Sequence, residues 1–165
     1  MTGNEPVVLV TGGSRRVGAA IVQRLHREGW RVAIHYRASQ PEAAALADQM
    51  NAIRPNSALT VAAELLEVAA LAPLVARVVE HFGRLDALVN NASTYYATPI
   101  GDIAMQDWEA LMGSNLRAPL FLAQAAAPHL KASGGSIVNI VADIWGSMPG
   151  MGHSGAARAS SALPT

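Results

Sequence analysis

Short apolar runs rich in valine and isoleucine alternate with longer helical stripes along this chain, and no other feature limits its fold as strongly. The runs have the unbroken hydrophobicity of strands that are buried on both faces. In the segments between them, apolar residues recur every three or four positions, as on the buried face of a helix. We expect strands at 6–11, 31–36, 58–62, 85–90 and 136–141, and helices at 15–28, 41–53, 68–82 and 105–130.

Strands that alternate with helices of this length are joined by right-handed crossovers, which place the strands parallel in one sheet. The sequence therefore predicts an α/β fold, namely a Rossmann-type, doubly wound parallel sheet of about five strands with helices on both faces. A length of 165 residues suits one domain, so we assign 1–165 to a single domain.

Composition argues against several classes of protein. The chain has no cysteine for a disulfide or a thiolate site, and its five histidines lack metal-ligand spacing. A formal net charge of zero gives no broad positive field for nucleic acid or an anionic membrane. The start lacks the pattern of a signal peptide, and no stretch approaches the roughly 20 apolar residues of a membrane span. We expect a cytoplasmic protein without metal, nucleic-acid or membrane partners.

A glycine-rich turn follows the first expected strand, at 11–18, and leads directly into a helix. In an open parallel sheet, ligands bind beyond the carboxyl ends of the strands, where a helix N-terminus offers unpaired N–H groups. Gly12 lets the backbone approach a pyrophosphate, and Gly18 lets the helix pack closely on the sheet. An ordinary tight turn is the alternative, but the strand, turn and helix context favours a dinucleotide. The candidate cofactor-binding residues here are Gly12, Ser14, Arg15, Arg16, Val17 and Gly18.

The end of the second expected strand discriminates between the two nicotinamide dinucleotides. An acidic residue there bonds the ribose hydroxyls of NAD, whereas arginine pairs with the additional phosphate of NADP. The sequence has no acid at this place, and its candidates are His35, Tyr36, Arg37 and Ser39. With Arg15 and Arg16 in the neighbouring turn, several donors can converge on one dianion, unless these arginines are only solvated surface. We predict NADP(H) as the cofactor.

Four motifs occur in order along the chain: the turn at 11–18, Asn-Asn-Ala at 90–92, Ser-Asn-Leu at 114–116 and Gly-Ser-Ile-Val-Asn-Ile at 135–140. Together they resemble the short-chain dehydrogenases/reductases over about 7–158. Within that family the chain is similar to pteridine reductases, which have arginine at the position of Arg16, where most members have glycine. They also have a stretch like 91–100.

This resemblance implies further contacts with the cofactor. Asn91, Ala92 and Ser93 would line its ribose and nicotinamide side. Glu64 stands where the family usually has an aspartate that bonds the adenine amino group, with Leu65 beside it. The additional methylene of glutamate changes the geometry of that contact.

Two more residues are implied at the substrate and in the proton relay. Tyr95, with Ser93 beside it, matches an aromatic residue that stacks on the pterin, and a plain packing aromatic is the alternative. Asn115 matches the helix asparagine that holds a water of the family's proton relay. Its alternative role is to satisfy backbone groups beside Pro119.

The family's reaction takes a proton from a tyrosine whose pKa is lowered by a lysine four residues later. Here Ser154 stands at the tyrosine position and Arg158 at the lysine position. The pKa of serine is too high for this role, whereas arginine keeps the positive charge and can contact the ribose. The family's preceding serine or aspartate aligns with Ala142, so Asp143 reaches the site only if the register slips, and His153 is an alternative acid. The catalytic candidates are Asn115, Asp143, Ser154 and Arg158.

We therefore expect an NADP(H)-dependent short-chain reductase that transfers hydride to a pterin or another small substrate with a C=N or C=O bond. The first alternative is an enoyl-CoA or 3-oxoacyl reductase, because 154–158 is similar to a segment of some enoyl-CoA reductases. The second is a non-catalytic, truncated relative that binds NADP(H). In this family the C-terminal third adds two strands and much of the subunit interface. We expect a dinucleotide-binding domain that lacks its C-terminal strands, and a homo-oligomer, a dimer or tetramer, for a full-length form.

Overall fold

The computed structural model describes residues 5–99 and 101–141. Its strands are β1 (Val7–Val10), β2 (Arg31–Tyr36), β3 (Ala58–Ala62), β4 (Ala87–Asn90) and β5 (Ser136–Asn139). Its helices are α1 (Arg16–Arg27), α2 (Gln40–Ile53), α3 (Val68–Phe82), α4 (Met105–Met112), the π-helix η1 (Gly113–Arg117) and α5 (Ala118–Ser133).

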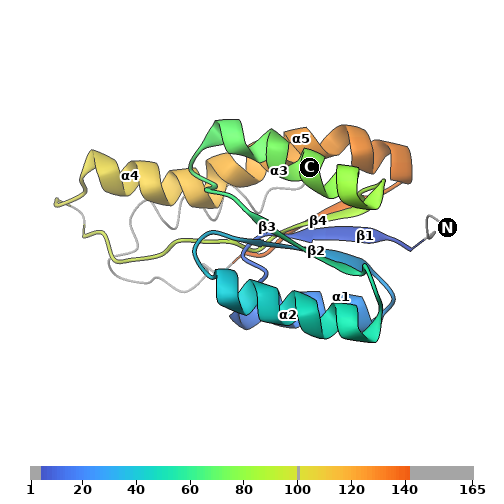
Figure 1. Cartoon of the computed structure of the whole chain (residues 1–165). Helices are drawn as coiled ribbons and strands as arrows, with labels where there is room; N and C mark the ends of the chain where they lie inside the picture. Colours follow the sequence, from blue (N-terminus) through green and yellow to red (C-terminus); the bar gives the residue numbers. More distant parts are fainter. Residues whose placement is uncertain (1–4, 100, 142–165) are drawn as a thin grey trace.

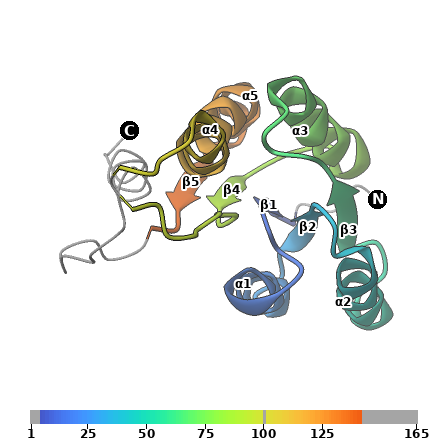
Figure 2. The same cartoon turned by 90° about the vertical axis from the view of Figure 1, so that its left-hand side faces the viewer.

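The five strands form one parallel sheet in the order β3-β2-β1-β4-β5. Helices α1 and α2 cover one face of the sheet, and α3 and α5 cover the other (Figure 2). Helix α4 lies on the side of α3 and α5 and extends past the strands (Figure 1). The expected doubly wound α/β fold is thereby confirmed.

Strand β1 lies at the centre of the sheet and is buried on both faces. Val7 and Leu9 belong to the core cluster on the side of α3 and α5. Val8 and Val10 belong to the cluster on the side of α1 and α2. Each fully buried side chain of this kind contributes roughly 1.5–3 kcal/mol of hydrophobic stabilisation. Strand β1 is therefore held firmly in the core, and it fixes the position of the turn that follows it.

The segment that the sequence predicts as one helix at 105–130 is divided into α4, η1 and α5. Pro119 has no N–H, so the carbonyl of Asn115 cannot receive the ordinary bond from four residues later. The N–H of Ala118 bonds instead to the carbonyl of Gly113, five residues back, which is the wider turn of a π-helix. The expected helix is therefore present over 105–133, and it contains a π-helical turn that the sequence pattern did not predict.

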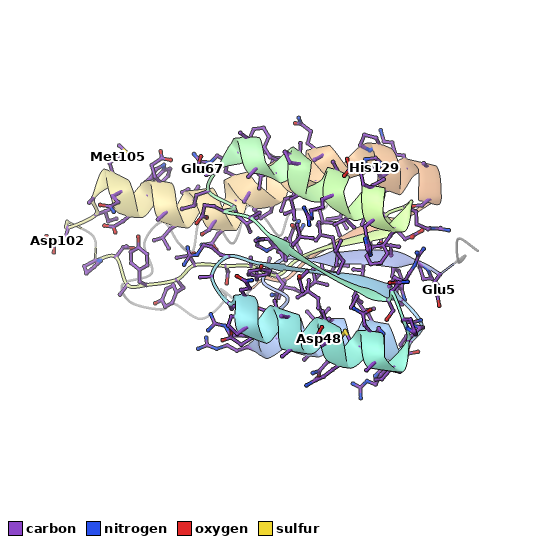
Figure 3. The ribbon with its side chains drawn as sticks, in the orientation of Figure 1. Glu5, Asp48, Glu67, Asp102, Met105 and His129 are labelled. Carbon is purple, nitrogen blue, oxygen red and sulfur yellow. The ribbon has the colours of Figure 1, made fainter. Side chains whose placement is uncertain are left out.

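The chain leaves β1 toward β2 and β3, then crosses to the other side of β1 for β4 and β5. Because the two sets of crossovers cover opposite faces, a crevice opens at the carboxyl ends of β1 and β4. In Figure 3 this is the end marked by Asp102 and Met105, and Glu5 lies at the opposite end. Within the described ranges, no helix has both the length and the hydrophobicity of a membrane span.

Candidate cofactor-binding cleft

A cleft of about 610 Å³ opens at the carboxyl ends of the strands. Every residue that the sequence assigns to the cofactor lines it, namely Gly12, Ser14, Arg15, Arg16, Val17, Gly18, His35, Tyr36, Arg37, Ser39, Glu64, Leu65, Asn91, Ala92 and Ser93. Asn115, a catalytic candidate, lines it as well. Residues from distant parts of the chain therefore meet in one place, and their binding of a cofactor stays a prediction.

The turn at 11–18 needs glycine at two positions. Gly12 has a φ of 60°, in the left-handed region that glycine adopts without strain. A Cβ on Gly18 would collide with the carbonyl oxygen of Gly12. The first turn of α1, whose N–H groups have no helical acceptor, therefore lies directly against the turn and lines the cleft.

Hydrogen bonds from the end of β4 hold one side of this turn. The backbone N–H groups of Asn91 and Ala92 both donate to Oγ1 of Thr11 at 3.0 Å. The Nδ2 of Asn91 donates to the carbonyl oxygens of Thr11, at 2.9 Å, and Gly12, at 3.2 Å. Asn91 thus orients the turn, in addition to lining the cleft.

His35, which is only 2% exposed, holds the other side of the turn. Its Nδ1 accepts from the N–H of Gly12 at 3.1 Å, and its carbonyl accepts from the N–H of Gly13 at 2.9 Å. Its Nε2 donates to the carbonyl of Ala63 at 3.1 Å, so the ring is neutral with its proton on Nε2. Burial lowers the pKa of His35 and outweighs the Ala63 bond and the Glu64 carboxylate, which raise it.

Arg16 begins α1 with a φ of 51°, in the region that favours glycine. A residue with a side chain costs roughly 1–2 kcal/mol in this conformation. The backbone thus favours glycine at this position, but this chain has arginine there. Since Arg16 lines the cleft, the strain points to a role in binding.

The other two arginines of the cleft are in long, exposed ion pairs. The distance between Arg15 and Glu42 is 3.7 Å, and that between Arg37 and Glu64 is 3.9 Å. Both arginine side chains are 65% exposed. Exposed pairs of this kind are typically worth about 0–1 kcal/mol, so an incoming anion can replace the carboxylates at small cost.

Two pairs of polar side chains lie deeper in the cleft. The hydroxyls of Ser14 and Ser39 are 2.6 Å apart, and Asn90 Nδ2 donates to Asn139 Oδ1 at 2.9 Å. Oδ1 of Asn90 is buried without a hydrogen-bond partner in the part of the chain that the structure describes. An acceptor is therefore left for a donor from a water or a ligand.

Several lining residues were not among the expected site residues: Ala38, Leu66, Asn90, Thr94, Ser114, Pro119, Asn139, Ile140 and Val141. Asn90 and Asn139 end β4 and β5, so their position at the carboxyl end of a strand was a usable signal. Ser114 and Ile140 lie in the motifs at 114–116 and 135–140, and Thr94 lies in the stretch 91–100, but none of them was named as a site residue.

Asn115 lies in η1 and is 6% exposed. Its Oδ1 accepts from the backbone N–H of Thr94 at 3.1 Å, and its Nδ2 donates to the carbonyl of Thr94 at 2.8 Å. The side chain therefore satisfies backbone groups, but those of the segment after β4 and not those beside Pro119. Whether it also takes part in a proton relay stays a prediction.

The remaining expected site residues lie elsewhere. Tyr95 is 50% exposed and is not part of the described lining of the cleft, so its contact with a substrate stays a prediction. Asp143, Ser154 and Arg158 lie outside the described residues, as does His153.

The chemistry of the cleft fits the phosphates of a dinucleotide. It combines three guanidinium groups, those of Arg15, Arg16 and Arg37, with the N–H groups at the start of α1 and a pair of serine hydroxyls. Among residues 5–99 and 101–141, no group of three or more histidine, aspartate or glutamate side chains is suited to a metal ion.

Comparison with known proteins gives several relatives. The chain is 37% identical to pteridine reductase 1 of Leishmania tarentolae over 196 positions, which cover 96% of this chain and 68% of that protein. It is 42% identical to a ketoacyl reductase of the granaticin polyketide synthase of Streptomyces violaceoruber, with 87% of this chain and 57% of that protein covered. It is 36% identical to the hydroxynaphthalene reductase arp2 of Aspergillus fumigatus, with 78% and 46% covered.

The chain thus spans between about half and two thirds of the length of these relatives. A protein-family model described as short chain dehydrogenase matches residues 6–157, which include β1, the glycine-rich turn and all the described lining of the cleft. From this match and these relatives, the chain belongs to the short-chain dehydrogenase family.

Proposed function

We propose that this chain binds NADP(H) in the cleft, as part of a short-chain oxidoreductase that reduces a small substrate. Membership of the family implies a nicotinamide cofactor. The observation that carries the choice of NADP(H) is that Arg15, Arg16 and Arg37 line one cleft while the end of β2 carries no acid. An additional phosphate gives these guanidinium groups a dianion to bind, whereas NAD(H) offers no such partner.

The substrate that we propose is a pterin or another small molecule with a C=N or C=O bond. The similarity to a pteridine reductase and the arginine at position 16 support it. The bound nicotinamide would supply a hydride. On the protein side, Arg158 would keep a positive charge near the ribose, and Ser154 or Asp143 would occupy the proton-donating side.

A 3-oxoacyl or enoyl-CoA reductase is the second candidate. The relative with the highest identity of those named above carries the name of a ketoacyl reductase, which favours an acyl carrier as substrate. A chain that binds NADP(H) without turnover is the third, because Ser154 replaces the tyrosine that the family uses as proton donor.

Titration calorimetry with NADPH and NADH tests the cofactor. We expect NADPH to bind at least about tenfold more tightly, and Arg37→Ala to remove most of that difference while leaving NADH affinity unchanged. Equal affinities of the unmodified chain for the two nucleotides would contradict the proposal. NADPH oxidation with dihydrobiopterin, a 3-oxoacyl thioester and an enoyl thioester then separates the candidate substrates, and tight binding without oxidation supports the third candidate.

A further inference from the structure

His35 lies where three segments of the cleft meet. The hydrogen bonds of its ring are made to residues that are distant in the sequence. Its Nδ1 contacts the turn after β1, 23 residues earlier, and its Nε2 contacts the end of β3, 28 residues later. A single ring in the lining of the cleft therefore connects the turn, β2 and β3.

The peptide groups of Gly12 are fixed from two directions. Its N–H donates to His35, and its carbonyl accepts from Nδ2 of Asn91. The same carbonyl lies against Gly18 in the first turn of α1. Any displacement of Gly12 therefore displaces the N–H groups at the start of α1, which are the groups that bind phosphate in such turns.

Protonation of His35 would remove the acceptor that this arrangement needs. Nδ1 would then carry a proton that faces the N–H of Gly12, so two donors would oppose each other at the present distance of 3.1 Å. Because the side chain is 2% exposed, water cannot readily enter to separate them. The turn would have to move.

The charged groups around this ring come from each neighbouring segment. Glu64 follows β3, and its carboxylate acts to stabilise a charge on His35. That carboxylate is paired with Arg37 at the end of β2, while Arg15 and Arg16 line the cleft from the turn and α1. The end of β4 contributes the uncharged side chains of Asn90 and Asn91. Burial of the ring outweighs the Glu64 carboxylate and opposes a charged His35.

We propose that His35 is a positioning residue that holds the phosphate turn in its binding conformation only while its ring is neutral, so that acid weakens nucleotide binding. This inference rests on the proposed binding of NADP(H) in the cleft. Burial lowers the pKa of His35, which confines the loss of affinity to the acid side of about pH 6.5.

The test is the pH dependence of NADP+ affinity in the unmodified chain and in His35→Asn, from about pH 7.5 to about pH 5. The asparagine Oδ1 can accept from Gly12 and does not titrate. We expect the unmodified chain to lose about tenfold more affinity over this range than His35→Asn. The titration of the nucleotide's own phosphate, near pH 6, is common to both proteins and cancels in the ratio. Circular dichroism at each pH restricts the comparison to folded protein.

A nucleotide-free measurement separates this inference from the proposed function. In long-range ¹H–¹⁵N spectra of the unmodified chain near pH 7.5, we expect an unprotonated Nδ1 and a protonated Nε2, with the Gly12 amide signal shifting as His35 titrates. A protonated Nδ1, or equal pH dependence in the two proteins, would overturn the role of His35. Absence of NADP+ binding at every pH would overturn the proposed function instead, and the spectra alone would then decide the role of His35.

Discussion

The two ends of the sheet use arginine in opposite ways. At the amino end, Arg54 is 26% exposed and its guanidinium group donates to backbone carbonyls and to a carboxylate, namely those of His26, Gly29, Trp30 and Glu5. At the carboxyl end, Arg15 and Arg37 are 65% exposed, and each is paired with a carboxylate, at 3.7 and 3.9 Å. The amino end joins α1, β2 and the segment before β3 with bonds that the chain itself completes. The carboxyl end leaves its cations available to a ligand.

The two buried histidines differ in the same way. His26 Nε2 lies 2.7 Å from the hydroxyl of Ser57, and that hydroxyl donates to the carbonyl of Arg54. A protonated His26 would keep its bond to Ser57, because Nε2 already donates it. A protonated His35 would lose its bond from Gly12. Protonation therefore leaves the His26–Ser57 bond at the amino end in place, whereas at the carboxyl end it removes the bond between Gly12 and His35.

The largest expected effect is that of Arg54→Ala at the amino end. It removes the guanidinium donor from the carbonyls of Gly29 and Trp30, so we expect the free energy of unfolding to fall by about 3 kcal/mol, measured by urea denaturation. The affinity for NADPH should stay within about twofold. Arg37→Ala is the matched control at the carboxyl end, where we expect a change in stability within about 0.5 kcal/mol. A reversed order of the two stabilities would break the comparison.

Acid should destabilise the chain through both histidines. The pKa of His26 is lowered by burial and by Arg54, and that of His35 by burial. The unfolded chain therefore binds protons below about pH 6.5 that the folded chain does not, so stability falls as the pH falls through this window. Each histidine contributes at most about 1.4 kcal/mol per pH unit. Denaturation between about pH 7.5 and about pH 5.5 should give a smaller slope for His35→Asn than for the unmodified chain, and identical slopes would contradict this.

The cost of a left-handed backbone should be about 1 kcal/mol greater at Arg16, in the cleft, than at Asn56, at the other end of the sheet. Arg16, with φ of 51°, and Asn56, with φ of 58°, both have left-handed backbones, one in the cleft and one in the loop between α2 and β3. We expect Arg16→Gly to raise the free energy of unfolding by about 1 kcal/mol and to weaken NADPH binding. Asn56→Gly should raise stability by only a few tenths of a kcal/mol, since asparagine tolerates this conformation, and should leave binding unchanged. If Arg16→Gly binds NADPH as well as the unmodified chain does, the strain has no binding role.

The smallest expected effect concerns the ion pair between Arg15 and Glu42. Glu42→Gln removes a competitor for the arginine, so we expect NADPH affinity to rise about twofold, measured by calorimetry at low salt. Glu28→Gln removes the partner of Arg24 in a pair at the other end of α1 and should not change affinity. An equal rise in both variants would point to overall charge and not to release of Arg15.

Local patterns predicted most of the fold. The stripe at 68–82 predicted α3 with its observed bounds, and β2 and β3 also agree with the expected ranges. Periodicity missed the π-helix because it registers which residues are apolar and not which N–H groups are absent, as in Pro119. The residues that line the cleft could be predicted from the rule that ligands bind at the carboxyl ends of parallel strands.

The function of His35 within the turn was beyond prediction from the sequence. His35 was expected only as a contact of the cofactor, because it lies near the end of the second strand. Its partners Gly12 and Ala63 become its neighbours only once three strands have aligned in register. Likewise, Asn115 makes its bonds to Thr94 from the π-helical turn, which periodicity did not reveal.

The central position of β1 has a consequence for how the chain reaches its native state. One neighbour of β1, the strand β2, follows it closely. The other is β4, and Asp86, directly before β4, accepts from the N–H of Val7 across 79 residues. During synthesis one edge of β1 therefore stays unpaired until β4 has been made, when more than half of this chain has left the ribosome. Because such long-range pairings form slowly, the interval between the two pairings is the period in which a nascent chain of this kind is most open to aggregation and most in need of a chaperone.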